Sequence, residues 1–280
     1  MTATTHQSST SLKSVLNRLR RDYFPTMRFS EPRAGIAVAH DRDCNFTSTF
    51  QPIVRASDGA IGGHQALLRA ADGDGNEVAP SELFAHAGDA AALEQLDRLA
   101  RAIHAVNYFG TPNDGQRLFL TVDPRMLAAA PDDHRCYFDA LLTALDVPTS
   151  RVVVCLPEAA LEDPVTFVRA TVSYAIRGYR VLAEMRPEAH ADLEHVFLAD
   201  PQYVAIDASC LVPSASGDSR RRQVRTLVDS LHSRGIQVVA RRIETEAQAQ
   251  AARETGFAFL QGRHVAPPAL RPVTATGLAA

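Results

Sequence analysis

One stretch near the carboxyl end decides the fold. It starts at Ile236 with Ile-Gln-Val-Val-Ala-Arg-Arg-Ile-Glu-Thr-Glu and ends at Gly262 with Phe-Ala-Phe-Leu-Gln-Gly. The apolar run that ends at Ala240 predicts a short strand buried on both faces. Residues 257–260 predict a second strand of the same kind. The two strands are separated by a length of chain that suits one helix.

The residues between and after these strands predict a β-α-β unit. Thr245 is a common helix N-cap and Gly256 a common helix stop, so we expect a helix between them. Polar residues follow both strands, at 241–244 and at Gln261. In a parallel α/β barrel, the chemistry lies at the carboxyl ends of the strands. The stretch therefore predicts both a barrel and the position of its site.

The same alternation of strand and helix runs back toward the amino terminus. Apolar runs of strand length recur, bounded by turn residues, at 50–55, 64–69, 118–122, 152–156, 180–184 and 203–207. Helical patterns lie between them, starting at Pro80, covering Ala91–Val106 and Pro164–Ile176, and opening at Arg220. A chain of 280 residues suits a single barrel domain as well as two smaller domains, and the regular alternation favours the barrel. We predict an α/β fold with one barrel.

Composition narrows the function classes. The net charge is -3, so no global positive field favours nucleic acid as a partner. The four cysteines are scattered without a Cys-x-x-Cys pair, which is typical of reduced thiols in a cytosolic protein. No apolar run has the ~20 residues of a membrane span, and the amino terminus lacks the apolar core of a signal peptide. We expect a cytoplasmic protein that binds neither membrane nor nucleic acid.

The first 45 residues are expected to lie outside the barrel. Residues 1–10 are polar, and a helix with an apolar stripe follows from Ser11 and ends before Pro25. The opposite face of that helix is basic, so the helix either docks on the barrel with a solvated face or contacts a partner protein or nucleic acid. Residues 26–45 show no period and are interpreted as a linker. The predicted division is 1–45 for tail, helix and linker, 46–270 for the barrel, and 271–280 for a carboxyl-terminal tail.

Four short motifs resemble one family. They are Gln51-Pro52-Ile53-Val54, Gln65-Ala66-Leu67-Leu68-Arg69, Ala240–Thr245, and Gln261-Gly262. Their order and spacing resemble those of EAL domains, the bacterial cyclic di-GMP phosphodiesterases, over residues 48–268. The resemblance implies a TIM-like (β/α)8 barrel of the EAL type, here with an N-terminal helical extension.

The resemblance also implies which residues stand at the family's active-site positions. Six metal-site positions are altered, and they now carry Gln65, Thr121, Cys155, Met185, Ala205 and Arg241. Five polar positions are kept or conservatively changed: Glu158, Glu184, Asp207, Glu244 and Gln261. A two-metal phosphodiesterase needs clustered carboxylates around its ions, and an amide binds a hard cation less well. We therefore expect no metal, no cofactor and no hydrolysis.

Without catalysis, three functions remain to be compared. EAL domains that lack catalysis serve either as protein-interaction modules or as cyclic di-GMP receptors. The first hypothesis is a signalling protein that binds an unknown protein partner, for which the N-terminal helix is one candidate contact. The second is a cyclic di-GMP receptor, because Gln51, Leu67, Leu68 and Arg69 match positions that line the family's nucleotide pocket. The third is a residual phosphodiesterase.

Two of these residues carry a more specific expectation. Arg69 either pairs with a phosphate or is a structural residue that forms a salt bridge at the barrel rim. Arg241 would place a permanent positive charge where the family holds a cation. We expect Glu158, Glu184, Asp207 and Glu244 to approach one another at the barrel mouth, with Arg241 bridging two of them as a built-in counter-ion.

Overall fold

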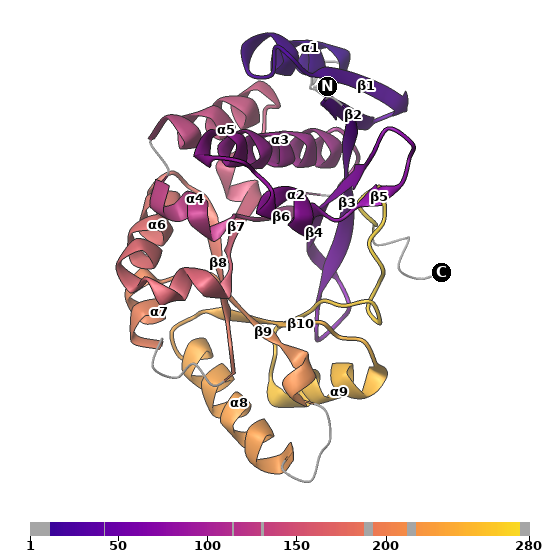
Figure 1. Cartoon of the computed structure of the whole chain (residues 1–280). Coiled ribbons are helices and arrows are strands. Elements are labelled where there is room, and N and C mark those ends of the chain that lie inside the picture. Colours follow the sequence, from indigo (N-terminus) through magenta and orange to yellow (C-terminus); the bar gives the residue numbers. More distant parts are fainter. Residues whose placement is uncertain are drawn as a thin grey trace, which may run out of the picture.

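The computed structural model describes residues 12–41, 43–113, 115–129, 132–187, 193–211 and 217–274. Its strands surround the centre of the molecule and its helices lie at the periphery (Figure 1). The ring of strands is closed and has the order β3, β11, β10, β9, β8, β7, β6, β4, after which β4 pairs with β3 again. The predicted barrel is confirmed.

The strands of the ring are β3 (Cys44–Arg55), β4 (Ile61–Ala71), β6 (Arg117–Thr121), β7 (Val152–Leu156), β8 (Arg180–Met185), β9 (Tyr203–Asp207), β10 (Gln237–Arg241) and β11 (Phe259–Leu260). Pairing is parallel from β4 through β6 and on to β11. β3 alone runs antiparallel to both of its neighbours in the ring, β4 and β11. The barrel thus opens with a hairpin formed by β3 and β4.

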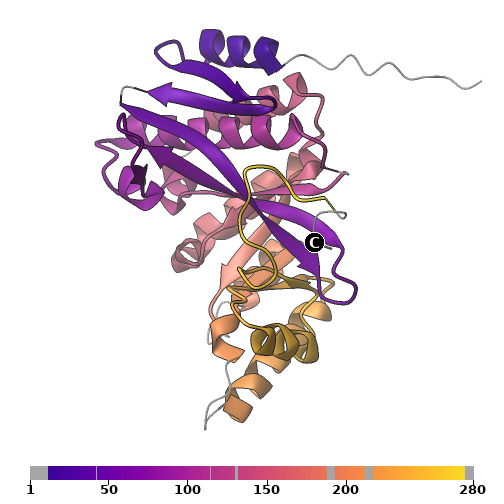
Figure 2. The same ribbon diagram turned by 90° about the vertical axis from the view of Figure 1, so that its right-hand side faces the viewer.

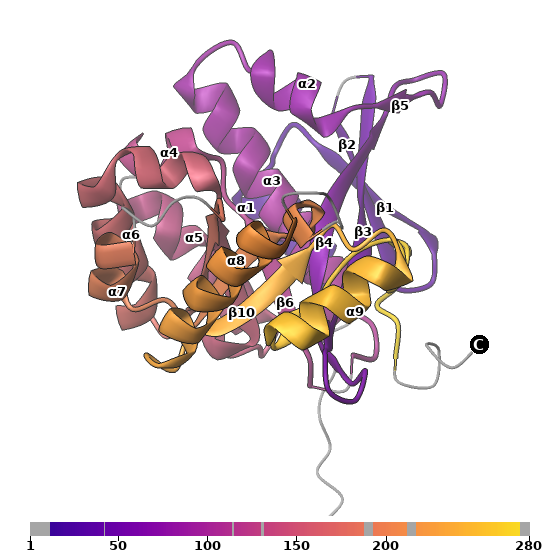
Figure 3. The same ribbon diagram turned by 90° about the horizontal axis from the view of Figure 1, so that it is seen from below.

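The helices that cover the outside of the ring are α2 (Pro80–Ala85), α3 (Ala90–Phe109), α4 (Pro124–Ala129), α5 (Asp132–Ala144), α6 (Pro164–Ile176), α7 (Leu193–Ala199), α8 (Gly217–His232) and α9 (Glu246–Thr255). Seen from below, α8 and α9 lie across the end of the molecule, with α6 and α7 on the opposite side from α9 (Figure 3). Within the described ranges, no helix combines the length and the apolar character that crossing a membrane requires.

The stretch that decides the fold is built as predicted. Thr245 caps α9 in a capping box with Gln248, and Gly256 ends the helix at φ +99°, a conformation that glycine adopts without strain. β10 and β11, which precede and follow α9 in the sequence, pair with each other in parallel. Both strands start one or two residues later than predicted, because pairing begins only at Gln237 opposite Tyr203 for β10 and at Phe259 opposite Val239 for β11.

The linker predicted at 26–45 is wrong. β1 (Arg28–Arg33) and β2 (Ile36–Asp41) form an antiparallel hairpin around Gly35, and β2 continues the sheet by pairing with β3. The hairpin is anchored by α3, since the side chain of Asn107 accepts from the backbone N–H of Ala37 at 2.6 Å and donates to its carbonyl at 3.0 Å. β3 consequently starts at Cys44 rather than near Phe50.

α1 (Leu12–Asp22) lies on this hairpin at one end of the molecule (Figures 1 and 2). Val15, Leu16 and Leu19 are buried, and the ring of Tyr23 packs edge-on against Tyr137 of α5 with centroids 4.4 Å apart. The basic side chains on the other face are exposed. The predicted N-terminal helical extension is confirmed, and it packs on the β1–β2 hairpin and on α5. Residues 1–11 lie outside the described part of the chain.

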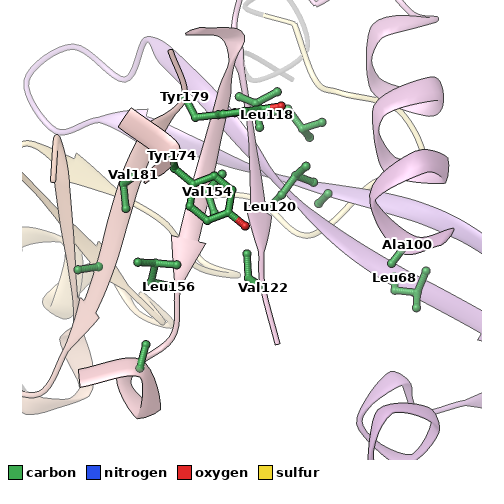
Figure 4. Close-up of a cluster of buried hydrophobic side chains, with 14 of the residues drawn as sticks. Leu68, Ala100, Leu118, Leu120, Val122, Val154, Leu156, Tyr174, Tyr179 and Val181 are labelled. Atoms are coloured by element: carbon green, nitrogen blue, oxygen red, sulfur yellow. The ribbon is translucent and has the colours of Figure 1, made fainter. Parts of the chain in front are cut away.

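Alternation along the strands divides the apolar side chains between two cores. Phe119, Val153, Cys155 and Leu182 point into the barrel, where they pack with Tyr203, Ala205 and Val239. Their neighbours in the sequence point outward to the helices: Leu118, Leu120, Val154, Leu156 and Val181 (Figure 4). Parallel strands buried on both faces explain why these segments are continuously apolar. The barrel interior is therefore filled with side chains up to the level of its mouth.

The carboxyl-terminal segment crosses β3 next to the barrel (Figure 2). Phe50 and Ala269 exchange two backbone hydrogen bonds at 2.7 and 3.0 Å. Further on, Val273 accepts a hydrogen bond from the ring of buried His64 at 3.1 Å. The segment therefore packs as part of the fold to Thr274; residues 275–280 of the predicted tail lie outside the described residues.

Candidate functional site

The carboxyl ends of the strands bring five predicted residues together at the barrel mouth. Gln65 comes from β4, Thr121 from β6, Glu184 from β8 and Arg241 from β10, while Gln261 follows β11. Parallel strands end at the same rim, so residues far apart in the sequence meet there.

The amide of Gln65 is the centre of this polar layer. Its Oε1 accepts from Arg241 Nη2 at 2.8 Å and from Gln261 Nε2 at 2.6 Å. Its Nε2 donates to Thr121 Oγ1 at 3.2 Å. The same Gln261 nitrogen lies 3.2 Å from Oε1 of Gln51, which stands directly opposite Gln65 in the β3–β4 ladder. One amide oxygen with two donors uses both of its lone pairs.

Arg241 joins this layer to a carboxylate. Its Nη1 donates to Glu184 Oε1, and the two side chains are only 25 % and 26 % exposed. The guanidinium thus spans Glu184 and Gln65, with one side of its planar fork on each. Removing one partner of such a partly buried pair costs more than it does in a surface pair, because the other charge is left uncompensated.

The other carboxylates do not converge on Arg241, contrary to the expectation from the sequence. Glu158, at the start of the 3-10 turn after β7, pairs with Arg186 Nε at 2.6 Å. Asp207 pairs with Arg242 Nη1 at 2.8 Å. Arg241 therefore contacts one carboxylate and one amide, not two carboxylates. Three separate acid–arginine pairs lie at the mouth, and the fourth predicted carboxylate, Glu244, lines the cavity there.

Asp207 and Arg242 form the most exposed of these arrangements at the end of β9 and β10. Partial burial raises the pKa of Asp207, but the backbone N–H of Ser209, 2.8 Å from Oδ1, and the Arg242 guanidinium outweigh it and hold the pKa below its usual value. The Arg242 backbone is left-handed at φ +59°, which is uncommon for a residue with a side chain. This turn sends Arg242 toward Asp207.

Three predicted positions are apolar and buried. Cys155 and Ala205 lie inside the barrel below the polar layer, and Met185 packs in the outer core among the helices. Burial raises the pKa of the Cys155 thiol, and the nearby Glu184 carboxylate acts in the same direction. Cys155 is therefore a protonated thiol at neutral pH, and among the described residues no group of three or more His, Cys, Asp or Glu side chains could hold a metal ion.

The four residues predicted to line a nucleotide pocket border two cavities. Leu67, Leu68 and Arg69 line a cavity of about 450 Å³ between β4, α3 and the end of β6. Gln51, Leu67 and Arg69 line a smaller one of about 230 Å³ at the mouth, together with Arg241, Arg242, Glu244, Gln261 and Arg263.

Arg69 donates to Thr49 Oγ1 and to Glu77 Oε1, both at 3.1 Å. It is thus held at the rim by an internal salt bridge, with its side chain 39 % exposed.

Sequence reasoning missed several arginines at this site, and it gave no role to Gly262 of the Gln261-Gly262 motif. Arg186, Arg242 and Arg263 were not predicted, although Arg242 stands within the motif already singled out at 240–245.

Gly262 has no room for a side chain, because a Cβ would lie 2.0 Å from the carbonyl oxygen of Ile243. Ile243 in turn donates its N–H to Gln261 O at 3.0 Å. The close contact fixes the turn that aims Gln261 into the mouth.

The family assignment follows from comparison with known proteins. The EAL domain profile matches residues 36–268, and the chain belongs to this family. The match starts within β2, before the position where the motifs begin. No curated protein matches the sequence.

Solved EAL structures share the fold. The EAL domain of Pseudomonas aeruginosa FimX bound to cyclic di-GMP superposes with a TM-score of 0.71 at 18 % identity, covering 80 % of this chain and 91 % of that one. Bacillus subtilis YkuI, in complex with cyclic di-GMP and calcium, gives 0.64 at 19 % identity over 80 % and 55 %. The EAL enzyme Bd1971 in a cAMP-bound form gives 0.67 at 18 % identity over 80 % and 63 %, so this chain spans under two thirds of that protein.

Proposed function

We propose that this chain is a non-catalytic EAL protein of bacterial cyclic di-GMP-related regulation, acting in the cytoplasm by binding another protein. The proposed absence of catalysis rests on the position of Arg241 between Glu184 and Gln65. Its guanidinium donates to one oxygen of the carboxylate that a divalent ion would need. A fixed positive charge there opposes any cation.

The residues at the mouth do not fit two divalent ions. Hard cations take oxygen ligands, preferably carboxylates, and a two-metal site needs several of them close together. Here Glu158 and Asp207 face Arg186 and Arg242. Below them lie a protonated thiol and the methyl group of Ala205, neither of which is a ligand for such an ion. No hydrolytic step is assigned to these residues.

The inference of a protein partner has separate support. Large apolar side chains are exposed on α6 and α7, as expected of a surface that another protein covers. The exposed basic face of α1 is a second candidate contact. Neither surface contributes to the barrel mouth.

A cyclic di-GMP receptor is the second candidate, favoured by the arginines at the mouth. Arg69, Arg241, Arg242 and Arg263 border the cavity of about 230 Å³, next to the larger one lined by Leu67 and Leu68. Guanidinium groups suit phosphate recognition without a metal. FimX and YkuI, which share the fold, have cyclic di-GMP bound in their structures.

Calorimetry with cyclic di-GMP, with and without Mg²⁺ or Ca²⁺, decides between the two candidates. The proposed function predicts no binding heat and no thermal stabilisation at saturating ligand. The receptor function predicts metal-independent binding that Arg69→Ala weakens by about 1.5–3 kcal/mol, the worth of a charged hydrogen bond. Heat that appears only with the metal would contradict both, since it would mean that the mouth holds an ion.

A further inference from the structure

The helix α6 is apolar on both of its faces. Phe167, Ala170 and Tyr174 are buried against the barrel, as the inner face of a covering helix should be. On the outer face Val165 is 76 % exposed and Ile176 is 80 % exposed. A helix that is apolar all round is typical of a helix covered on both sides.

The neighbouring helix α7 extends this apolar surface. The two helices lie side by side on the rim of the molecule (Figures 1 and 3). Leu198 of α7 is 70 % exposed and lines, with Val165, Val172 and Ile176, a groove of about 770 Å³. Among the described residues, four of the five exposed large apolar side chains line this one groove. Such concentration marks an interaction surface rather than scattered exposure.

The charges along the groove have one sign. Among the described residues, its charged or titratable lining residues are Arg169, Arg177 and His195, and none of the described lining residues is acidic. Arg177 is held by Asp139, whose Oδ2 lies 3.0 Å from its Nε. Arg169 is exposed, six residues after the Asp163 that caps the helix. The groove is therefore apolar along its floor with a basic side chain available beside it.

We propose that the groove between α6 and α7 binds an amphipathic helix of a partner protein, which carries acidic residues beside its apolar stripe. This inference rests on the proposed function and names the surface through which it acts. α6 has 13 residues and is about 20 Å long, so it can support three to four turns of a bound helix. Helix-in-groove binding uses apolar anchors at such spacing.

A second copy of this chain fits the groove less well. A two-fold interface brings the same patch onto itself, which places the basic side chains of the described lining near one another. Like charges across an interface disfavour association. Charge complementarity therefore selects an acidic partner.

The test uses a labelled helical peptide of about 14 residues with leucines spaced three and four apart and glutamates beside them. A matched peptide has lysines in place of the glutamates. Anisotropy titrations at low salt compare the full chain with Ile176→Glu, Arg169→Glu and Leu270→Glu. Leu270 is the matched control, because it is an exposed apolar residue that does not line the groove.

We expect the glutamate peptide to bind about fivefold more tightly than the lysine peptide. Ile176→Glu should weaken its binding by about tenfold or more, Arg169→Glu should reverse the preference, and Leu270→Glu should change neither. Failure of the glutamate peptide to bind, or equal binding of both peptides, overturns the inference. So does a concentration-dependent dimer in sedimentation that Ile176→Glu abolishes, since the occupant is then a second copy.

These outcomes are independent of the barrel mouth. Hydrolysis of cyclic di-GMP would contradict the proposed function whatever the peptide does. If the chain neither hydrolyses cyclic di-GMP nor binds the peptide, the proposed function stands, but its contact surface lies elsewhere, for example on α1.

Discussion

Replacing Arg241 with alanine should destabilise the folded chain far more than replacing its sequence neighbour. The change removes two hydrogen bonds, to Glu184 and to Gln65 Oε1. It also leaves the Glu184 carboxylate three-quarters buried without a cation. The loss therefore includes an uncompensated charge as well as the missing contacts.

The size of the effect follows from the exposure of the pair. Breaking a fully buried ion pair costs about 3–5 kcal/mol, and breaking a surface pair about 0–1 kcal/mol. With roughly a quarter of each side chain exposed, Arg241→Ala should cost about 2–3 kcal/mol.

Urea denaturation supplies the assay, and Arg242→Ala supplies the control. Arg242 has the same residue type at the same strand end, but it is 77 % exposed in its pair with Asp207, so its loss should cost at most about 1 kcal/mol. A double-mutant cycle of Arg241→Ala with Glu184→Gln should give a coupling of about 1–2 kcal/mol. Equal losses for Arg241→Ala and Arg242→Ala, or no coupling to Glu184, would refute the counter-ion reasoning.

Three further predictions concern groups around the mouth and in the core. Burial lowers the pKa of His64 to about 4 and that of His104 to about 3, so below pH 6.5 the unfolded chain binds protons that the folded chain excludes. The free energy of unfolding should therefore fall on acidification by about 1.4 kcal/mol per pH unit for each histidine. The variant His104→Gln should show a smaller slope of denaturation midpoint against pH. Gly262→Ala should cost about 2 kcal/mol or more in urea denaturation, because its Cβ meets the backbone of Ile243. Cys155 should react with a thiol reagent only on unfolding, whereas Cys44 and Cys210, which are partly exposed, should react in the folded chain.

Each of these predictions has a result that contradicts it. A midpoint independent of pH between 6.5 and 4.5 would mean that the histidines gain a stabilising partner when they are protonated. A neutral Gly262→Ala would mean that the turn before Ile243 can move aside. Labelling of Cys155 at the rate of Cys44 would place the thiol in contact with solvent.

The fold was predictable because its signals are local. Thr245 and Gly256 mark the ends of α9, and the strands buried on both faces stand out as continuous apolar runs such as Val152–Leu156. The hairpin at 28–41 gives no such signal. Its two strands are short, one contains Pro32, and its stability comes from contacts with α3 at Asn107, 70 residues away. The periodicity of apolar residues in the sequence does not predict such long-range contacts.

The composition of the site was predictable, but its pairing was not. Strand order alone places Gln65, Glu184, Arg241 and Gln261 at one rim. Which side chain meets which depends on rotamers and on backbone turns that no pattern encodes. The left-handed turn at Arg242 directs its side chain to Asp207, which leaves Arg241 to join Glu184 with Gln65.

The central claim is that arginine pairing has replaced metal chemistry at the barrel mouth, and a hydrolysis assay tests it most directly. Purified protein is incubated with cyclic di-GMP and Mg²⁺ or Mn²⁺, and linear dinucleotide product is measured against a blank without protein. We predict no product above the blank, for the native chain and for Arg241→Glu alike, because Gln65 would still leave an ion short of carboxylate ligands. Product formed by the native chain and abolished by Glu184→Ala would contradict the account.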